Sequence, residues 1–381
     1  MPCPRGRRSA GGRPVSAHEM FVPVSRRVRR GLGFEPGGAA VTVNSQQILD
    51  TLAARYRDTL ARHLGDCDDV VLLDFPNHAN VGDSLIWLGE IAALRQLGKT
   101  VRHVCSIWDY DPAALAAVLS ERTAILLHGG GNLGTIWPQH QALREAVLRD
   151  FPQHKVIQLS QSIHFKDEAD AAAFGSLAHG HRHFVLFARD HVSQAFACRV
   201  FDCAVELVPD SALVLRPRPS RDPQVDVVAL LRTDVERKVD GDGPAALKRL
   251  SRSARVVDWL EVPGLERGLG RLDAFRARHP RHLDGSRHGT KQWLWEQLAQ
   301  ARARRGIDML SSGRVVLTDR LHAVILSCLL GRPMVALDNT YGKIGSFVDT
   351  WLAQWPTLIR ATDAAAAAAG VERLLSAQGA P

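Results

Sequence analysis

The chain has 381 residues, of which 45% are hydrophobic and 23% are charged, and its formal net charge is +8. This length exceeds one average domain, and the composition is that of a folded globular protein rather than a disordered or fibrous one. No apolar run approaches the roughly 20 residues that span a bilayer. The six cysteines are scattered without a CxxC pair, which argues against a zinc or redox site and predicts a reduced, cytoplasmic protein.

The positive charge is concentrated at the start of the chain. Residues 1–30 contain eight arginines and one glutamate, so the remainder is close to neutral. Residues 1–40 are rich in Arg, Gly, Pro and Ser and lack the apolar stretch of a secretory signal, so we predict a disordered basic tail; translation from Met20 is an alternative. Such a tail favours at most peripheral membrane contact, and the neutral body argues against nucleic-acid binding.

Residues 45–215 alternate helical periodicity with short apolar runs, which is typical of βαβ units around a parallel sheet. We interpret this region as an N-terminal domain. The predicted strands are 70–75, 100–104, 124–127, 155–159, 184–188 and 205–208. The predicted helices are 46–64, 84–97, 112–119, 139–149, 168–177 and 192–198.

Residues 216–224 contain three prolines and no periodicity, so we interpret them as a linker. The alternation then resumes over 225–362, which predicts a second α/β domain, and 363–381 should form a surface helix and tail. The predicted strands are 225–231, 256–260, 315–317 and 333–337. The predicted helices are 245–252, 265–278, 291–310 and 321–330.

The stretch FPNHANVGDSLIW lies at a strand-to-helix turn of the N-terminal domain. Asn80, Gly82 and Asp83 fall where the backbone amides of a helix N-terminus face a ligand, and Gly82 allows backbone torsions that a side chain would forbid. The stretch predicts a loop for a phosphate or an acceptor. The alternative is a capped helix start with local turns.

The stretch LHGGGNLG follows another predicted strand. Gly129, Gly130 and Gly131 let the main chain approach a ligand or another backbone closely, and Asn132 and His128 add polar contacts. The spacing is neither that of a dinucleotide-binding GxGxxG nor that of a Walker loop. A glycine-rich turn used only for tight packing is the alternative.

Three further polar side chains follow predicted strands: His164, Arg189 and Asp210. Arg189 comes after four apolar residues and should stand at the mouth of the sheet. The alternative is a salt bridge to Asp190 or to Asp210.

The segment 318–343 contains a strand, a tight turn and a helix that place Arg320 and His322 beside a helix N-terminus. Lys343 follows the next strand and should reach the same edge. An Arg, a His and a Lys at this position suit a small, highly charged anion. The alternative is that Arg320 and His322 only cap the helix and pair with local acids.

Several catalytic signatures are absent from the sequence, namely GxSxG, HExxH, a Cys–His pair and a DxD-type diphosphate site. Their absence argues against hydrolases, metalloproteases and metal-dependent sugar-nucleotide transferases. We predict no metal site.

Six segments in order resemble the polysaccharide pyruvyl transferase family: FPNHANVGDSLIWLGE, LHGGGNLGTIWPQHQ, QLSQSIHF, ARDHVS, LVPDSALVL and TDRLHAVILSCLLGRPMVALDNTYGKI. They spread across residues 75–344. Two positions depart from the family pattern. Thr135 stands where an acid is expected after Asn-x-Gly, and Ala323 replaces a frequent glycine after Arg-Leu-His.

The resemblance implies two Rossmann-like domains facing a cleft, as in GT-B glycosyltransferases. It implies transfer of pyruvate from phosphoenolpyruvate to a sugar of an exopolysaccharide or cell-wall precursor, free or lipid-linked, with a pyruvate ketal as product and no cofactor. Arg189 and Arg320 would clamp the donor, His322 would act as acid and base, and Lys343 would assist. The acceptor side would include Asn80, Gly82, Asp83, Gly129, Gly130, Gly131, Asn132, His164 and Asp210.

Two other functions stay open on the sequence. One is a metal-independent GT-B glycosyltransferase that uses a nucleotide sugar. The other is a polysaccharide-binding or assembly subunit that kept the fold without the chemistry, although the presence of both Arg320 and His322 argues against it.

Overall fold

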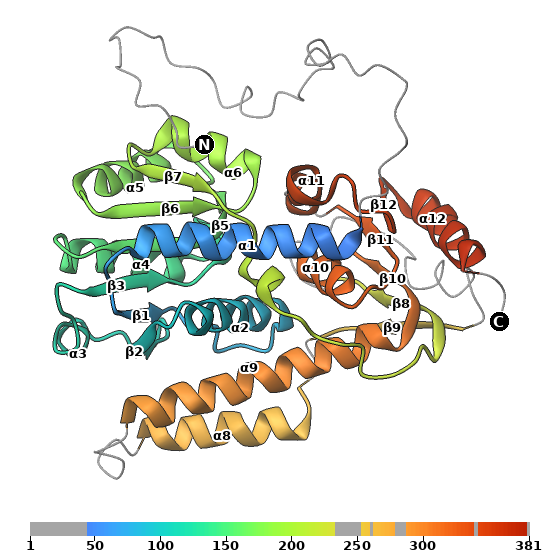
Figure 1. Cartoon of the computed structure of the whole chain (residues 1–381), viewed down its shortest axis with the longest axis horizontal. Helices are drawn as coiled ribbons and strands as arrows, with labels where there is room; N and C mark the ends of the chain where they lie inside the picture. Colours follow the sequence, from blue (N-terminus) through green and yellow to red (C-terminus); the bar gives the residue numbers. More distant parts are fainter. Residues whose placement is uncertain (1–43, 233–252, 260–261, 279–286, 339–341, 379–381) are drawn as a thin grey trace, which may run out of the picture.

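The computed structural model describes residues 44–232, 253–259, 262–278, 287–338 and 342–378. Within these ranges, two parallel sheets lie side by side (Figure 1). The first has the order β2-β1-β3-β5-β6-β7, with β4 pairing on β5, and the second has the order β12-β11-β10-β8-β9. The predicted α/β class with parallel sheets is confirmed.

The first sheet is formed by the first half of the chain. Its strands are β1 (Asp69–Leu73), β2 (Thr100–Cys105), β3 (Thr123–Leu127), β4 (Gly130–Gly134), β5 (Val156–His164), β6 (Phe184–Ala188) and β7 (Ala204–Leu207). Its helices are α1 (Ser45–Leu64), α2 (Val81–Gln96), α3 (Pro112–Ala116), α4 (Pro138–Asp150), α5 (Glu168–Gly180), α6 (His191–Val200) and the 3₁₀ turn η1 (Ser211–Val214).

The second sheet follows in the chain. Its strands are β8 (Val225–Leu230), β9 (Ala254–Val257), β10 (Gly313–Thr318), β11 (Met334–Leu337) and β12 (Leu358–Ala361). The helices after β9 are α8 (Gly264–Arg278), α9 (Arg287–Ser311), α10 (Leu321–Leu329), α11 (Lys343–Phe347), the π-helical turn η3 (Val348–Leu352) and α12 (Ala364–Ala377).

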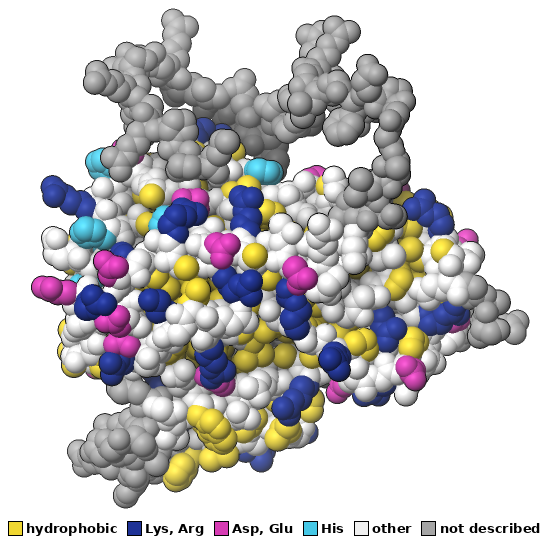
Figure 2. Space-filling model, viewed as in Figure 1, with side chains coloured by type: hydrophobic (Ala, Val, Ile, Leu, Met, Phe, Trp, Pro, Cys, Tyr) yellow, Lys and Arg dark blue, Asp and Glu magenta, His cyan; other side chains and the backbone are white. Residues whose placement is uncertain are grey.

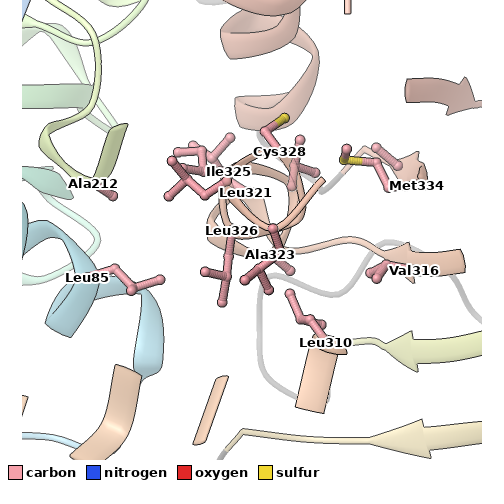
Figure 3. Packing of buried hydrophobic residues seen from close by; sticks show 14 of the residues in the cluster. Leu85, Ala212, Leu310, Val316, Leu321, Ala323, Ile325, Leu326, Cys328 and Met334 are labelled. Atoms are coloured by element: carbon pink, nitrogen blue, oxygen red, sulfur yellow. The ribbon is translucent and has the colours of Figure 1, made fainter. Parts of the chain in front are cut away.

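The strands are apolar on both faces because helices cover both faces of each sheet. In β1, Val70, Val71, Leu72 and Leu73 are all fully buried. A group of buried apolar side chains between the two sheets connects them. Figure 3 shows the side chains of α10 between β10 and β11 on one side and Leu85 of α2 on the other, and these residues form one cluster.

Helix α9 belongs to the second half of the sequence but packs on both halves of the molecule (Figure 1). The ring of Trp295 stacks on Phe75 with centroids 4.4 Å apart. The ammonium of Lys291 donates a hydrogen bond to the carbonyl of Val104 at 2.7 Å. The periodicity of 291–310 predicted the helix correctly, but it did not indicate that the helix would cover the first sheet.

Some predicted elements were wrong in their bounds. The glycine stretch, predicted as a loop, forms β4, because β5 continues to His164 and offers it a pairing edge. Strand β9 lies earlier than predicted, and β12 and α11 were not predicted. The predicted tail 1–40 and helix 245–252 lie outside the described residues.

Candidate functional site

A cavity of about 400 Å³ lies where the carboxyl ends of strands from both sheets meet, the usual ligand position in parallel α/β folds. From the first half of the chain it is lined by Pro76, His78, Ala79, Asn80, Asp83, His128, Gly131, Asn132, Trp137, His140 and Arg189. From the second half it is lined by Arg232, Trp259, Arg320, Leu321, His322 and Lys343.

Asp210 joins two of the predicted site residues. The Nη1 of Arg189 donates to its Oδ2 at 3.0 Å, and the Nε2 of His322 lies 3.2 Å from the same oxygen. Burial opposes the ionisation of this carboxyl, but His322 and Arg189 outweigh it and hold the pKa of Asp210 well below its usual range. The predicted salt bridge of Arg189 to Asp210 therefore exists, and Arg189 borders the cavity as well.

Arg320 lies at the N-cap of α10 and is only 4% exposed. Its Nη2 donates to Oδ1 of Asp258 at 3.2 Å, and its guanidinium lies 6.0 Å from the ring of Trp259. The side chain of Arg320 makes no capping hydrogen bond to α10, and the first turn of this helix contains no Asp or Glu. The positive end of the α10 dipole therefore faces the cavity together with a buried cation.

Two cationic side chains, those of Arg189 and Lys343, lie next to Gly131. A Cβ at this position would lie 3.3 Å from Nη2 of Arg189 and 3.5 Å from Nζ of Lys343. The glycine thus leaves room for both cations at one wall of the cavity, where Lys343 begins α11.

Helix α2 begins opposite α10. Asn80 is its N-cap and accepts a hydrogen bond from the amide of Gly82 at 3.0 Å. A Cβ on Gly82 would overlap Nδ1 of His322 and lie 2.7 Å from its Cγ. Gly82 is therefore required by the close approach of the imidazole, a reason that the sequence did not indicate.

Asp83 stands in the first turn of α2 and is a quarter exposed. Burial would raise the pKa of Asp83, but the histidines around it, His78 and His322 first among them, lower it below the usual value. The carboxyl of Asp83 is therefore ionised near neutral pH.

The glycine stretch divides between the cavity and the core. Asn132 lines the cavity, and its Oδ1 accepts from Nε2 of Gln161 at 2.7 Å and from Arg144. Gly129 packs in the interior, since a Cβ there would lie 2.8 Å from the carbonyl of Ser160. Gly130 has a φ of 129° and does not line the cavity.

His164 ends β5 and does not line the cavity. Its carbonyl accepts from the amide of Thr135 at 3.0 Å, which holds the end of β4 against β5. The predicted acceptor residues His164, Gly129 and Gly130 thus support the cavity wall without bordering the cavity.

Two carboxylate–histidine pairs lie at the cavity, and of their four side chains the sequence had indicated only His128, as a polar contact of the glycine stretch. The Nδ1 of His128 lies 2.7 Å from Oε2 of Glu90, and both side chains are almost completely buried. Burial raises the pKa of Glu90. Burial alone would lower the pKa of His128, but the facing Glu90 outweighs this effect and raises it.

The second pair joins His140, whose Nδ1 lies 2.7 Å from Oδ1 of the buried Asp74. Asp74 has a φ of 74°, a left-handed conformation that Asp tolerates better than most residues. One feature of the sequence could have indicated both histidines, since His128 and His140 fall within the segment LHGGGNLGTIWPQHQ.

The cavity therefore has two chemically different walls. Arg189, Arg320 and Lys343 form a cationic wall that suits a phosphate or a carboxylate. Asp83, Asn80 and Asn132 form a wall of acceptors and amides that suits hydroxyl groups. His322 lies where the two walls meet.

Two features are absent from the part of the chain that the structure describes. No helix in this part is long and apolar enough to cross a membrane. Within the same residues, no group of three or more His, Cys, Asp or Glu side chains could hold a metal ion.

The chain is similar to known proteins over most of its length. The model of the family described as "Polysaccharide pyruvyl transferase" matches residues 80–341. Pyruvyl transferase 1 of Schizosaccharomyces pombe is 32% identical over 299 residues, which are 74% of this chain and 69% of that protein. EpsO of Bacillus subtilis, assigned as a pyruvyl transferase, is 28% identical over 300 residues, which are 76% of this chain and 87% of that protein.

A solved structure supports the fold. The crystal structure of a functionally uncharacterised protein from Klebsiella pneumoniae matches with a TM-score of 0.52 and 18% identity. The match covers 82% of this chain and 98% of that one.

Proposed function

Because this chain belongs to the polysaccharide pyruvyl transferase family, we propose that it transfers pyruvate from phosphoenolpyruvate to a sugar of an exopolysaccharide or cell-wall polysaccharide precursor, forming a pyruvate ketal. The observation that carries the proposal is the position of His322. It lies between a wall of three cations and a wall that suits hydroxyl groups, and Asp210 holds its ring.

The cationic wall fits the donor. Phosphoenolpyruvate carries a carboxylate and a phosphate, and guanidinium groups bind such oxyanions through paired hydrogen bonds. Arg189 and Arg320 supply two guanidinium groups from opposite halves of the chain, and Lys343 adds an ammonium. The N-terminus of α10 adds its backbone amides.

The proposed reaction requires proton transfers that a histidine can make. A proton is added to the methylene carbon of the donor, and a sugar hydroxyl attacks the neighbouring carbon and loses its own proton. Phosphate then leaves, and a second hydroxyl closes the ketal with loss of a second proton. One of the two hydroxyl protons balances the proton added to carbon, and the other leaves with phosphate or solvent. His322 suits this work because an imidazole can both accept and donate a proton.

The acceptor would bind against the first half of the chain. Asn80, Asp83 and Asn132 line that wall, and Asp83 can accept hydrogen bonds from two hydroxyl groups. We place the reaction in the cytoplasm, and a lipid-linked sugar is compatible with this proposal.

A GT-B glycosyltransferase that uses a nucleotide sugar is the second candidate, because the two parallel sheets with a cavity at their carboxyl ends also suit that class. The two functions differ in their donor. Phosphate release from phosphoenolpyruvate in the presence of an acceptor extract supports the first, and consumption of a nucleotide sugar supports the second.

The test compares Arg320→Ala and His322→Ala with the surface controls Arg149→Ala and His179→Ala, whose side chains are 59% and 66% exposed. We expect His322→Ala to lower kcat by about 10² to 10⁴. Arg320→Ala should weaken phosphoenolpyruvate binding in calorimetry by roughly tenfold to a hundredfold. Folded variants with full activity and full donor binding would refute the assignment.

A further inference from the structure

The outer face of α8 presents large apolar side chains to solvent. Leu265, Leu272 and Phe275 are 63%, 58% and 62% exposed, and their spacing of seven and three residues places them on one side of the helix. Figure 2 shows hydrophobic side chains gathered over this part of the molecule. An exposed stripe of this kind on a folded protein usually marks an interaction surface.

The most buried side chains of α8 are two acids, Glu266 and Asp273. Glu266 accepts from Nε of Arg305 at 2.7 Å, and Asp273 accepts from Nη2 of Arg276 at 2.9 Å and from Asn77 at 3.4 Å. Leu269 of α8 packs on the core, but the acidic groups also face inward, and Leu265 and Leu272 face outward.

The charge of the exposed face has one sign. Arg267 and Arg271 are exposed beside the stripe. The acids of α8 are Glu266 and Asp273, and both are buried and paired. Among the described side chains of α8, none that is exposed carries a negative charge.

Two exposed tryptophans lie near the start of α9, one on this helix and one in the turn after β2. Trp293 of α9 is 59% exposed and Trp108 is 75% exposed. They flank the ion pair of Lys291 with Asp109, whose atoms are 2.5 Å apart. Tryptophan is favoured at the boundary between water and lipid, where its ring is half in each.

We propose that the outer face of α8 docks on an anionic lipid surface, with its apolar stripe in the acyl boundary and Arg267 and Arg271 among the headgroups. Apolar side chains flanked by cations are the composition of helices that lie in such an interface. A second copy of this chain fits less well, because a two-fold contact would bring the same arginines together without an exposed acid on the helix to pair them.

Docking at α8 would hold the cavity close to the lipid. Asn77 bonds to α8 directly, and Arg305 links Glu266 of α8 to the carbonyl of Ala79, which lines the cavity. The cavity wall therefore lies about one helix diameter, roughly 10 Å, behind the docking face. Lipid docking itself does not depend on the proposed reaction.

The test measures co-sedimentation of the full chain with vesicles of phosphatidylcholine alone and with vesicles that also contain phosphatidylglycerol. Leu272→Glu is compared with Val192→Glu, since both replace an exposed apolar side chain of a helix by the same acid. We expect binding only to the anionic vesicles and a loss of about tenfold or more in Leu272→Glu. Arg267→Gln and Arg271→Gln should each weaken binding about fivefold.

Three outcomes would overturn the proposal. One is equal binding by Leu272→Glu and the wild type, which would assign any lipid contact to the arginine-rich residues 1–30. Another is the absence of binding to both kinds of vesicle. The third is a dimer of the wild type in analytical ultracentrifugation that Leu272→Glu converts to a monomer, which would make this face a contact between copies.

Discussion

Helices α2 and α10 begin at the same cavity, each after the carboxyl end of a parallel strand, but their first turns differ in charge. The N-cap Asn80 of α2 bonds the amide of Gly82, and Asp83 stands in the first turn. The N-cap Arg320 of α10 makes no such bond, and its first turn holds His322 and no acid.

The difference supports the proposal that the two halves of the cavity bind two kinds of ligand. A helix N-terminus carries a partial positive charge that an anion can bind, unless an acid of the protein already lies there. Asp83 occupies the position at α2, so that end suits hydroxyl groups. At α10 the position is left for an anion, and Arg320 adds a full positive charge.

The largest expected effect comes from a variant that displaces His322 from its position over the start of α2. In Gly82→Ala the added Cβ would lie 2.7 Å from Cγ of His322, so the imidazole must leave its place. Because acid–base catalysis by a histidine contributes about 10² to 10⁴ in rate, we expect kcat to fall at least about a hundredfold. Phosphate release from phosphoenolpyruvate measures the change.

Gly180→Ala is the matched control, since a Cβ there meets no atom within 4 Å. Circular dichroism must show that both variants fold. If folded Gly82→Ala retained the kcat of the wild type, His322 would not act from its position over α2.

The sequence predicted the strands that place these helices better than it predicted the contacts between them. Short apolar runs identified strands such as β1 and β10 because a strand buried on both faces has few other compositions. The approach of His322 to Gly82 joins residues 240 positions apart in the sequence, and no local pattern carries such a contact.

The second prediction concerns the acid at α2. Asp83→Asn removes the negative charge but keeps a side chain of the same shape. Hydrogen bonds to a charged group are worth about 1.5–3 kcal/mol, so we expect the KM for the acceptor to rise about tenfold or more. The affinity for phosphoenolpyruvate should stay equal or increase, because the repulsion between Asp83 and the anion is removed.

Steady-state kinetics with varied acceptor, together with calorimetry of donor binding, separates the two effects. Asp170→Asn is the control, because Asp170 also lies in a first turn, that of α5, and is exposed. A variant of Asp83 that loses donor affinity and keeps the acceptor KM would reverse the assignment of the two walls.

The buried carboxylate–histidine pairs show why part of the site could not be predicted. Asp74 reaches His140 from a left-handed backbone conformation, and Glu90 reaches His128 from the third turn of α2. Sequence patterns show which residues are polar, but they do not show which polar residues are buried together. Three consecutive glycines are an uncommon pattern and were therefore predicted to contact a ligand. Gly129, however, packs against the carbonyl of Ser160 in the interior.

The smallest expected effect concerns the buried Glu90 of α2, whose carboxylate faces His128. Glu90 raises the pKa of His128 above its unfolded value of about 6.5. A histidine with a raised pKa contributes stability that is complete below pH 6.5 and is lost as the pH rises through the folded-state pKa. His128 should therefore contribute a loss of stability between pH 6.0 and 8.5, which the difference between the wild type and Glu90→Gln isolates.

Glu90→Gln should be less stable at both pH values and should lack this loss, because an uncharged amide no longer favours the imidazolium. Urea unfolding at pH 6.0 and 8.5 measures both effects, with Glu145→Gln, from the surface pair of Glu145 and Arg149, as the control. The raised pKa of Glu90 adds a loss of the same sign as the pH rises, and Glu90→Gln removes that loss as well. Equal pH dependence in Glu90→Gln and the wild type would show that His128 is neutral in the folded protein and that the negative charge of α2 acts at the cavity through Asp83 alone.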